Sequence, residues 1–226
     1  MYNIDLIVGA RPNFMKVSSI IREIDNGAQQ NKIIDYRLIH TGQHYDPSMS
    51  ASFFEDLNIP TPHVNFDVGS GSQAQQTAEI MIKYEELLSK SPTNLCLVVG
   101  DVNSTMACAI TAKKLNVPVV HVEAGIRSND WTMPEEVNRV VTDSISDWFF
   151  TTSISASENL YNLGVPKNNI FFVGNTMIDT LLLKEPKFVK PSLWDNENLQ
   201  LSNYFVLTLH RPSNVDSASL FKEMIS

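Results

Sequence analysis

The 226-residue sequence has little cysteine, no excess of basic residues and no long apolar run. Its 2 cysteines, Cys96 and Cys108, are too few for a disulfide scaffold, and we expect them to be buried thiols in a reducing compartment. The net charge of -8 argues against a nucleic-acid partner, because phosphate contacts need a basic surface. No apolar run approaches the ~18 to 20 residues of a membrane span, so we expect no contact with a membrane. The N-terminus has no basic leader followed by a cleavage site, and we expect a cytoplasmic protein.

Cofactor and metal motifs are also missing. The first predicted strand is not followed by G-x-G-x-x-G, which indicates that no nicotinamide cofactor binds there. The histidines of the polar run from His40 to Asp46 are not on a predicted helix and have no cysteine partner, so we expect no zinc. We therefore expect neither a cofactor nor a metal. What is present is the composition of a globular protein, 43% hydrophobic and 19% charged.

The most informative stretch runs from Asn94 to Arg139. It contains two apolar runs, Leu95 to Val99 and Val117 to Val120, separated by enough residues for one crossover helix over Ser104 to Leu115. Continuous β-branched runs of this length are typical of strands buried on both faces, which predicts a β-α-β unit in a parallel sheet. Strands and helices alternate along the rest of the chain in the same way. The sequence therefore predicts an α/β fold, a Rossmann-like parallel sheet with helices on both faces.

Ionisable side chains follow both apolar runs immediately. Ligands of open α/β sheets bind outside the carboxyl ends of the strands, which is where these side chains fall. Carboxylates and cations gathered there predict a proton-transfer site rather than a solvated surface. We expect Glu135 to belong to this site, whereas Glu136 is also explained as a first-turn acid that only stabilises its helix. The candidates of this stretch are Asp101, Glu123, Glu135, His121, Arg127 and Arg139.

Cationic side chains are also expected at the carboxyl edge of the first predicted strand, Asn3 to Val8. A helix begins at about Pro12, so Arg11 lies at the strand-to-helix turn and Lys16 one helical turn further along. Arg11 is either a surface arginine or an anion contact. His44, in the polar loop after the second predicted strand, is expected to face a substrate.

Two glycine-containing turns each allow two interpretations. Gly69 to Ser72 precedes a long predicted helix, and we favour a loop that ends in an N-capping serine over a phosphate loop. The turn Gly174-Asn175-Thr176 presents backbone N–H groups that either meet a phosphate or cap the next helix. Asn175 is therefore a candidate substrate contact.

A change of composition divides the chain. Residues 1–185 form the predicted N-terminal Rossmann-like domain, and residues 186–201, with two prolines and no clear periodicity, form a predicted linker. Tyr204 to Leu209 is a predicted strand and Ser217 to Ile225 a predicted helix. Because one strand and one helix cannot form a domain, we expect residues 202–226 to be the truncated beginning of a second Rossmann-like domain.

Seven motifs occur in order over nearly the whole chain: GARPNFMK, HTGQHYD, GDVNST, HVEAGIRS, PEEVNR, VGNTMID and LHRPSNVD. Together they resemble the non-hydrolysing UDP-N-acetylglucosamine 2-epimerases, a family of two-domain, GT-B-like proteins whose active site lies between two Rossmann-like halves. The resemblance implies a homodimer when full-length. It also implies that this chain supplies the first half and the beginning of the second, and is inactive alone because the cleft cannot close.

The reaction implied by the resemblance is the interconversion of UDP-GlcNAc and UDP-ManNAc, without a cofactor, by elimination of UDP to 2-acetamidoglucal and re-addition from the other face. No adjacent carbonyl stabilises a carbanion, so loss of the diphosphate must lead, and the site needs carboxylate bases and cations that hold the diphosphate. Many relatives have an acidic residue in place of Asn13, a difference that we expect to change the loop rather than the chemistry. Carried over by motif, the catalytic residues are Asp101, Glu123, Glu135 and His210, and the substrate-binding residues are Arg11, Lys16, His44, Arg139, Asn175 and Asn214.

Other activities remain open on the sequence alone. A GT-B glycosyltransferase would share the fold and the nucleotide-sugar ligand, although three carboxylates on one domain favour the epimerase, because an inverting transferase can work with one base. A hydrolysing epimerase would release ManNAc and UDP. A fragment that only binds would show no turnover even with the missing half restored.

Overall fold

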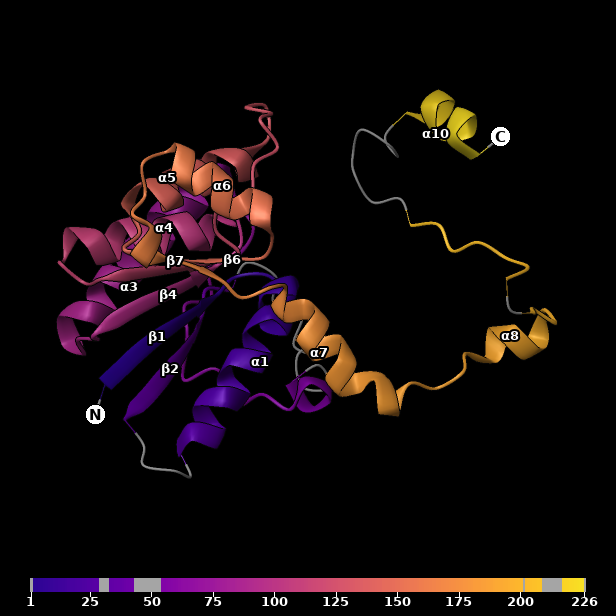
Figure 1. Ribbon diagram of the computed structural model, residues 1–226, viewed down its shortest axis with the longest axis horizontal. Coiled ribbons are helices and arrows are strands. Elements are labelled where there is room, and N and C mark those ends of the chain that lie inside the picture. Colours follow the sequence, from indigo (N-terminus) through magenta and orange to yellow (C-terminus); the bar gives the residue numbers. More distant parts are fainter. Residues whose placement is uncertain (1, 29–32, 43–53, 201, 209–216, 226) are drawn as a thin grey trace. The chain divides into compact units, whose positions relative to one another are not determined.

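The computed structural model describes residues 2–28, 33–42, 54–200, 202–208 and 217–225. The chain forms two compact units, Met1–Glu185 and Pro186–Ser226. Among the described residues, every strand lies in the first unit (Figure 1).

The described residues of the first unit form a seven-stranded sheet in the order β3-β2-β1-β4-β5-β6-β7. Every neighbouring pair is parallel, as the sequence predicted. The strand order reverses direction between β1 and β4, the position at which open α/β sheets bind ligands outside their carboxyl ends. The strands are β1 (Tyr2–Val8), β2 (Ile34–His40), β3 (Val64–Asn65), β4 (Leu95–Val99), β5 (Val119–Val122), β6 (Trp148–Thr151) and β7 (Ile170–Phe172).

Helices cover both faces of the sheet, which confirms the predicted architecture (Figure 1). One face carries α3, α4, α5 and α6, and the other carries α1 and α7. Side chains of β1 alternate between the two faces, so Leu6 joins the apolar cluster of Val17 on α1 and Ile7 joins that of Ile80 on α3. The helices are α1 (Arg11–Ala28), α3 (Gln73–Lys90), α4 (Asn103–Lys114), α5 (Pro134–Ile145), α6 (Ile154–Asn162), η1 (Lys167–Asn169) and α7 (Thr176–Lys184), and residues 54–57 are also helical.

The apolar stripe of α1 explains how this helix packs. Val17 and Ile21, one helical turn apart, are at most 1% exposed, and each buried side chain of this size contributes roughly 1.5–3 kcal/mol. A hydroxyl contact joins α7 to the same helix, because Thr180 donates to the backbone oxygen of Met15 at 2.8 Å. This contact lies beside Lys16, so packing of α7 supports the part of α1 that carries a predicted site residue.

Both glycine turns are helix caps. The Ser72 hydroxyl accepts a hydrogen bond from Gln75 N, and the Gln75 side chain accepts one from Ser72 N, both at 3.2 Å. This reciprocal pair is a capping box that begins α3. Asn175 begins α7 in the same role, because its side chain accepts from Met177 N at 3.0 Å. The capping interpretation is therefore confirmed at both turns.

The structure differs from the prediction at two strands. β5 continues to Val122, so His121 lies inside the strand rather than after it. Residues 204–208, the described part of the predicted strand Tyr204–Leu209, form no strand. A strand needs a neighbouring strand to bond its backbone groups, and the described residues of the second unit contain none. A linker over 186–201 and a second Rossmann-like domain over 202–226 stay predictions. The described helices after α7 are η2 (Glu185–Lys187), α8 (Ser192–Asn196) and α10 (Ala218–Ile225).

Both cysteines are buried and free of disulfides, as the sequence predicted. Burial raises the pKa of the Cys96 and Cys108 thiols, which keeps them protonated and unreactive. Among the described helices, none is both long and apolar enough to cross a membrane.

Candidate active site

Asp101 and Glu123 lie at the carboxyl edge of two neighbouring strands. Asp101 follows β4 and Glu123 follows β5, and β4 pairs with β5 in parallel. Parallel strands end at the same edge of a sheet, so the two carboxylates share that edge. Glu123 forms an ion pair with Lys16 of α1, and the two side chains are only 17% and 12% exposed. The fold thus brings together a predicted base and a predicted cation that are 107 residues apart in the sequence.

Gly100 allows the backbone to pass directly against this ion pair. Its φ is +72°, a conformation that glycine adopts without strain. A Cβ at this position would lie 3.2 Å from both Glu123 Oε2 and Lys16 Nζ. A larger residue would therefore push against the ion pair as well as strain the turn. Asp101 is the residue after Gly100, so the turn also places a second carboxylate next to this ion pair.

Arg139 of α5 forms the second ion pair. Its Nη2 pairs with Asp101, and its Nη1 donates to Glu136 Oε2 at 2.9 Å. Burial lowers the pKa of Arg139, but the charges of Asp101 and Glu136 outweigh burial and raise it. Asn138 supports the arrangement, because it donates to the Asp101 backbone oxygen at 2.8 Å and to Asn103 Oδ1 at 3.2 Å. These bonds tie α5 to the beginning of α4.

Glu136, rather than Glu135, is the buried carboxylate at the beginning of α5. Glu136 is 1% exposed and accepts hydrogen bonds from Ser128 N at 2.9 Å, Ser128 Oγ at 3.0 Å and Asn129 N at 3.0 Å. Burial alone would raise its pKa, but the hydrogen bonds from Ser128, Arg139 and Asn129 lower it to about 2. The interpretation of Glu136 as an acid that only stabilises its helix is therefore wrong. Glu135 is exposed, and its catalytic role stays a prediction.

Asn13 joins the ends of β1 and β4. Its Oδ1 accepts hydrogen bonds from Gly9 N at 3.2 Å and Ala10 N at 2.8 Å, and its Nδ2 donates to the backbone oxygen of Val99 at 3.0 Å. A carboxylate could accept the first two bonds but has no proton to donate to Val99. The amide of Asn13 therefore holds the turn after β1 against the end of β4. The sequence did not predict this contact with Val99.

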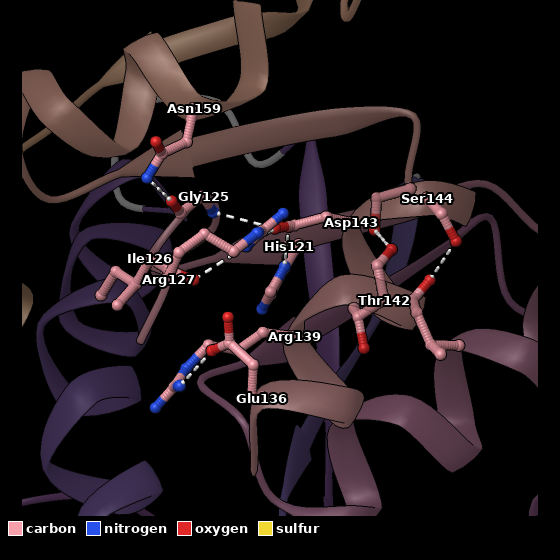
Figure 2. Close-up of polar contacts among 12 residues, drawn as sticks. His121, Gly125, Ile126, Arg127, Glu136, Arg139, Thr142, Asp143, Ser144 and Asn159 are labelled. Carbon is pink, nitrogen blue, oxygen red and sulfur yellow. Dashed lines mark hydrogen bonds and ion pairs between the residues drawn. The ribbon is translucent and has the colours of Figure 1, made fainter. Parts of the chain in front are cut away.

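His121 and Arg127 both bind Asp143 of α5 (Figure 2). His121 is 0% exposed, and its Nδ1 and Nε2 lie 2.6 Å from Asp143 Oδ1 and 2.9 Å from the Gly100 backbone oxygen. Arg127 pairs with Asp143 Oδ2 at 2.6 Å. The structure thus separates these two residues from the proton-transfer group in which the sequence placed them, because a buried carboxylate on α5 binds both.

The remaining predicted site residues fall into two groups. Arg11 is the first residue of α1 and Asn175 caps α7. Each follows the end of a strand, and both residues are exposed. His44, His210 and Asn214 lie outside the described residues. Their substrate and catalytic roles stay predictions.

The site therefore contains two carboxylate–cation pairs at one edge of the sheet, Glu123 with Lys16 and Asp101 with Arg139. Carboxylates can accept a proton and cations can hold an anionic leaving group, so the pairs suit acid–base chemistry on an anionic substrate. In the parts of the chain that the structure describes, no group of three or more His, Cys, Asp or Glu residues is arranged to hold a metal ion.

Comparisons with known proteins agree with this chemistry. A profile of the UDP-N-acetylglucosamine 2-epimerase family matches residues 26–226. The UDP-N-acetylglucosamine 2-epimerase of Methanocaldococcus jannaschii is 41% identical over 230 residues, which cover 98% of this chain and 60% of the relative. The UDP-2,3-diacetamido-2,3-dideoxy-D-glucuronate 2-epimerase of Pseudomonas aeruginosa is 39% identical over 213 residues, which cover 93% of this chain and 58% of the relative.

The fold is shared with a solved structure of the same kind. The crystal structure of the M. jannaschii UDP-GlcNAc 2-epimerase in complex with UDP-GlcNAc and UDP matches with a TM-score of 0.85 and 40% identity, covering 99% of this chain and 60% of that chain. The chain thus spans about 60% of the length of the relatives it matches. The sheet edge with its paired carboxylates, the profile match and this structural agreement lead to one conclusion: the chain belongs to the UDP-N-acetylglucosamine 2-epimerase family.

Proposed function

We propose that the protein to which these residues belong interconverts UDP-GlcNAc and UDP-ManNAc without hydrolysing them. The observation that carries the proposal is the pair of neighbouring ion pairs, Glu123 with Lys16 and Asp101 with Arg139, at the carboxyl edge of the sheet. Family membership supports the reaction type. Because the chain spans about 60% of its relatives' length, the activity is proposed for a protein that also has a second lobe.

The proposed reaction has two halves. In the first, the C1–O bond of the sugar breaks and UDP leaves with the bonding electrons, while a carboxylate removes the proton from C2 and a C1=C2 double bond forms. In the second, a proton is delivered to the opposite face of C2 and the UDP oxygen bonds again to C1. The departing diphosphate needs cations, and the two proton transfers need carboxyl groups on both faces of the ring.

The ion pairs suggest how the substrate prepares the site. Before substrate binds, Lys16 and Arg139 neutralise Glu123 and Asp101. A diphosphate that enters beside them competes for the same cations, because its two phosphates together carry two negative charges whereas one carboxylate carries one. Each cation that turns to the diphosphate leaves a carboxylate free to act as a base. Glu135, Arg11 and His210 are proposed to complete the site as a further acid–base group, a phosphate contact and a partner near the diphosphate.

A second substrate is a specific alternative. The P. aeruginosa relative, named for a diacetamido glucuronate sugar, is 39% identical, and the M. jannaschii relative, named for UDP-GlcNAc, is 41% identical. Overall identity therefore separates the two sugars poorly. Both carry an acetamido group at the carbon that is inverted, and the chemistry proposed for Asp101 and Glu123 serves either one.

The decisive experiment is turnover in heavy water. The chain is tested alone and joined after residue 226 to the part of the M. jannaschii enzyme that it does not cover, with each of the two UDP-sugars as substrate. We expect the joined protein to form the 2-epimer with solvent deuterium at the acetamido-bearing carbon, and the chain alone to show little turnover. Release of free ManNAc and UDP would instead identify a hydrolysing epimerase. Sugar transfer to an acceptor without deuterium incorporation would identify a glycosyltransferase.

We also propose that the full protein is a homodimer and works in the cytoplasm. The dimer follows from the family resemblance, and the two buried, reduced cysteines support a reducing compartment. Light scattering of the purified protein measures its mass in solution, and a monomer at micromolar concentration would contradict the dimer. Fractionation of the source cells tests the location.

A further inference from the structure

Asp143, near the end of α5, is a buried carboxylate with three donors around it (Figure 2). Its side chain is 1% exposed. Oδ1 lies 2.6 Å from His121 Nδ1, and Oδ2 accepts from Gly125 N at 3.1 Å and from Arg127 Nη1 at 2.6 Å. Burial alone would raise the pKa of Asp143, but His121 and Arg127 outweigh burial and lower it. The group is therefore an anion that holds a strand residue, a turn and an arginine together.

Both ring nitrogens of His121 face acceptors. Nε2 lies 2.9 Å from the Gly100 backbone oxygen, which has no proton to give, so Nε2 must carry a proton. Nδ1 lies 2.6 Å from Asp143, whose other oxygen already accepts two hydrogen bonds as a carboxylate does. A carboxylate at Oδ1 requires a proton on Nδ1 as well. The only neutral arrangement with the same geometry moves that proton to Asp143, and Arg127 and Gly125 both oppose this because they stabilise the anion.

The turn that carries Glu123 needs this support. Glu123 has φ +72°, which costs a residue with a side chain roughly 1–2 kcal/mol, and Gly125 has φ +78°. A Cβ on Gly125 would lie 2.2 Å from the Ala156 backbone oxygen, so the turn fits tightly against α6. Glu123 N and Ala124 N both donate to the Phe150 backbone oxygen, at 2.9 Å and 3.1 Å. The next backbone N–H of the turn, that of Gly125, donates to Asp143 Oδ2.

We propose that Asp143 is a positioning residue that holds His121 as a doubly protonated imidazolium and, through His121 and Gly125, fixes the turns that carry Gly100 and Glu123. His121 Nε2 donates to the Gly100 carbonyl, and the Gly125 N–H, two residues after Glu123, donates to Asp143. Asp143 thereby joins the ends of β4 and β5, the two strands that carry the carboxylates of the site. The importance of this placement for catalysis rests on the proposed function, but the charge of His121 does not.

The proposal can be tested on the wild-type chain without any substitution. With ¹⁵N-labelled histidine, NMR at pH 7.5 reads each ring nitrogen of His121 in the absence of any substrate. An ordinary histidine, with a pKa of about 6.5, is mostly neutral at that pH and carries one ring proton. We expect His121 to show a bonded proton on both ring nitrogens. A single ring proton, on Nε2, would overturn the proposal whether or not the protein is an epimerase.

Two variants separate charge from position. Asp143→Asn keeps the shape but removes the negative charge, so the Nδ1 proton should disappear while Gly125 N keeps an acceptor. Asp143→Ala also removes the acceptor, and we expect hydrogen exchange of the Gly125 amide to accelerate at least tenfold in this variant. The same exchange should stay within about twofold of wild type in Asp143→Asn.

Asp5→Asn is the matched control. Asp5 is another buried carboxylate, located on β1 and bound to Arg37 at 2.8 Å and to Tyr84 at 3.0 Å. Its replacement should leave both His121 ring protons and the Gly125 exchange rate unchanged. Loss of the Nδ1 proton in Asp5→Asn, or its persistence in Asp143→Asn, contradicts the proposal. If Asp143→Ala does not fold, the wild-type and Asp143→Asn spectra still decide the charge of His121.

Discussion

Arg139 lies one helical turn after Glu136 on α5, with its Nη1 2.9 Å from Glu136 Oε2, and from this position its other nitrogen reaches Asp101. Glu136 is thus the buried anchor of a cation that also contacts a predicted base. Its own hydrogen bonds from Ser128 and Asn129 hold the loop before the helix.

Glu136→Gln should remove a pH-dependent part of the stability. The folded-state pKa of Glu136 is about 2, below the ordinary value of 4.5, so its contribution is present above pH 4.5 and lost as the pH falls towards 2. We expect the variant to be less stable than wild type by roughly 2–3 kcal/mol at pH 7 and to differ from it much less at pH 2. Urea unfolding at both pH values measures this, with the exposed neighbour Glu135→Gln as the control that should change little. Equal losses at both pH values would mean that the charge of Glu136 is not what stabilises the fold.

Asn13→Asp should weaken the join between β1 and β4. The new carboxylate loses the bond to the Val99 oxygen and faces that oxygen with a negative charge. We expect a loss of roughly 1–3 kcal/mol in unfolding free energy at pH 7, smaller at pH 4, where the new acid can be protonated. Asn175→Asp is the control, because Asn175 uses only its oxygen and aspartate caps helices equally well. An Asn13→Asp protein as stable as the control would show that the Nδ2 bond contributes nothing.

Gly100→Ala should disturb the ion pair of Lys16 and Glu123 in addition to straining the turn. The control is Gly164→Ala, because Gly164 also has a positive φ, +85°, but a Cβ there would meet nothing within 4 Å. Backbone strain of roughly 1–2 kcal/mol should appear in both variants, measured by thermal unfolding. Only Gly100→Ala should also reduce turnover by the protein with both lobes. If both variants behave alike in stability and turnover, the turn after β4 does not approach the site as closely as the structure shows.

Glu123→Gln should abolish most of the proposed epimerase activity without unfolding the protein. An amide keeps the size of the side chain but cannot take a proton, and general acid–base groups contribute roughly 10²–10⁴-fold to a rate. We expect turnover and deuterium incorporation in the two-lobed protein to fall by at least 100-fold, with UDP affinity changed far less. The parallel variant Glu135→Gln decides whether that exposed residue also takes part. Full activity in Glu123→Gln would remove Glu123 from the reaction.

The patterns that predicted the fold are short in range. The apolar run from Leu95 to Val99 and the apolar stripe of α1 each show which residues are buried. The spacing of these residues along the chain indicates whether the segment is a strand or a helix. The predicted strand over 204–209 shows the limit of this logic, because its described residues are apolar enough for a strand but have no neighbouring strand to pair with. Strand formation depends on a partner that the local pattern does not contain.

The site was predicted in part for the same reason. Carboxylates at the ends of β4 and β5 had to share an edge once the sheet was parallel, so the common position of Asp101 and Glu123 could be predicted from the sequence. Which of Glu135 and Glu136 is buried depends on the side of α5 that faces the protein, and the spacing of three residues between Glu136 and Arg139 was a signal that Glu136 would pair with this arginine.

By itself, the sequence determined the α/β class, the parallel strands and the family, because each of these follows from neighbouring residues or from ordered motifs. Only the tertiary structure decided the partners: Lys16 for Glu123, Arg139 for Asp101, and Asp143 for His121. Charged groups choose partners by distance and burial, which depend on how segments up to 107 residues apart are packed. That packing is a property of the whole fold and not of any stretch of the chain.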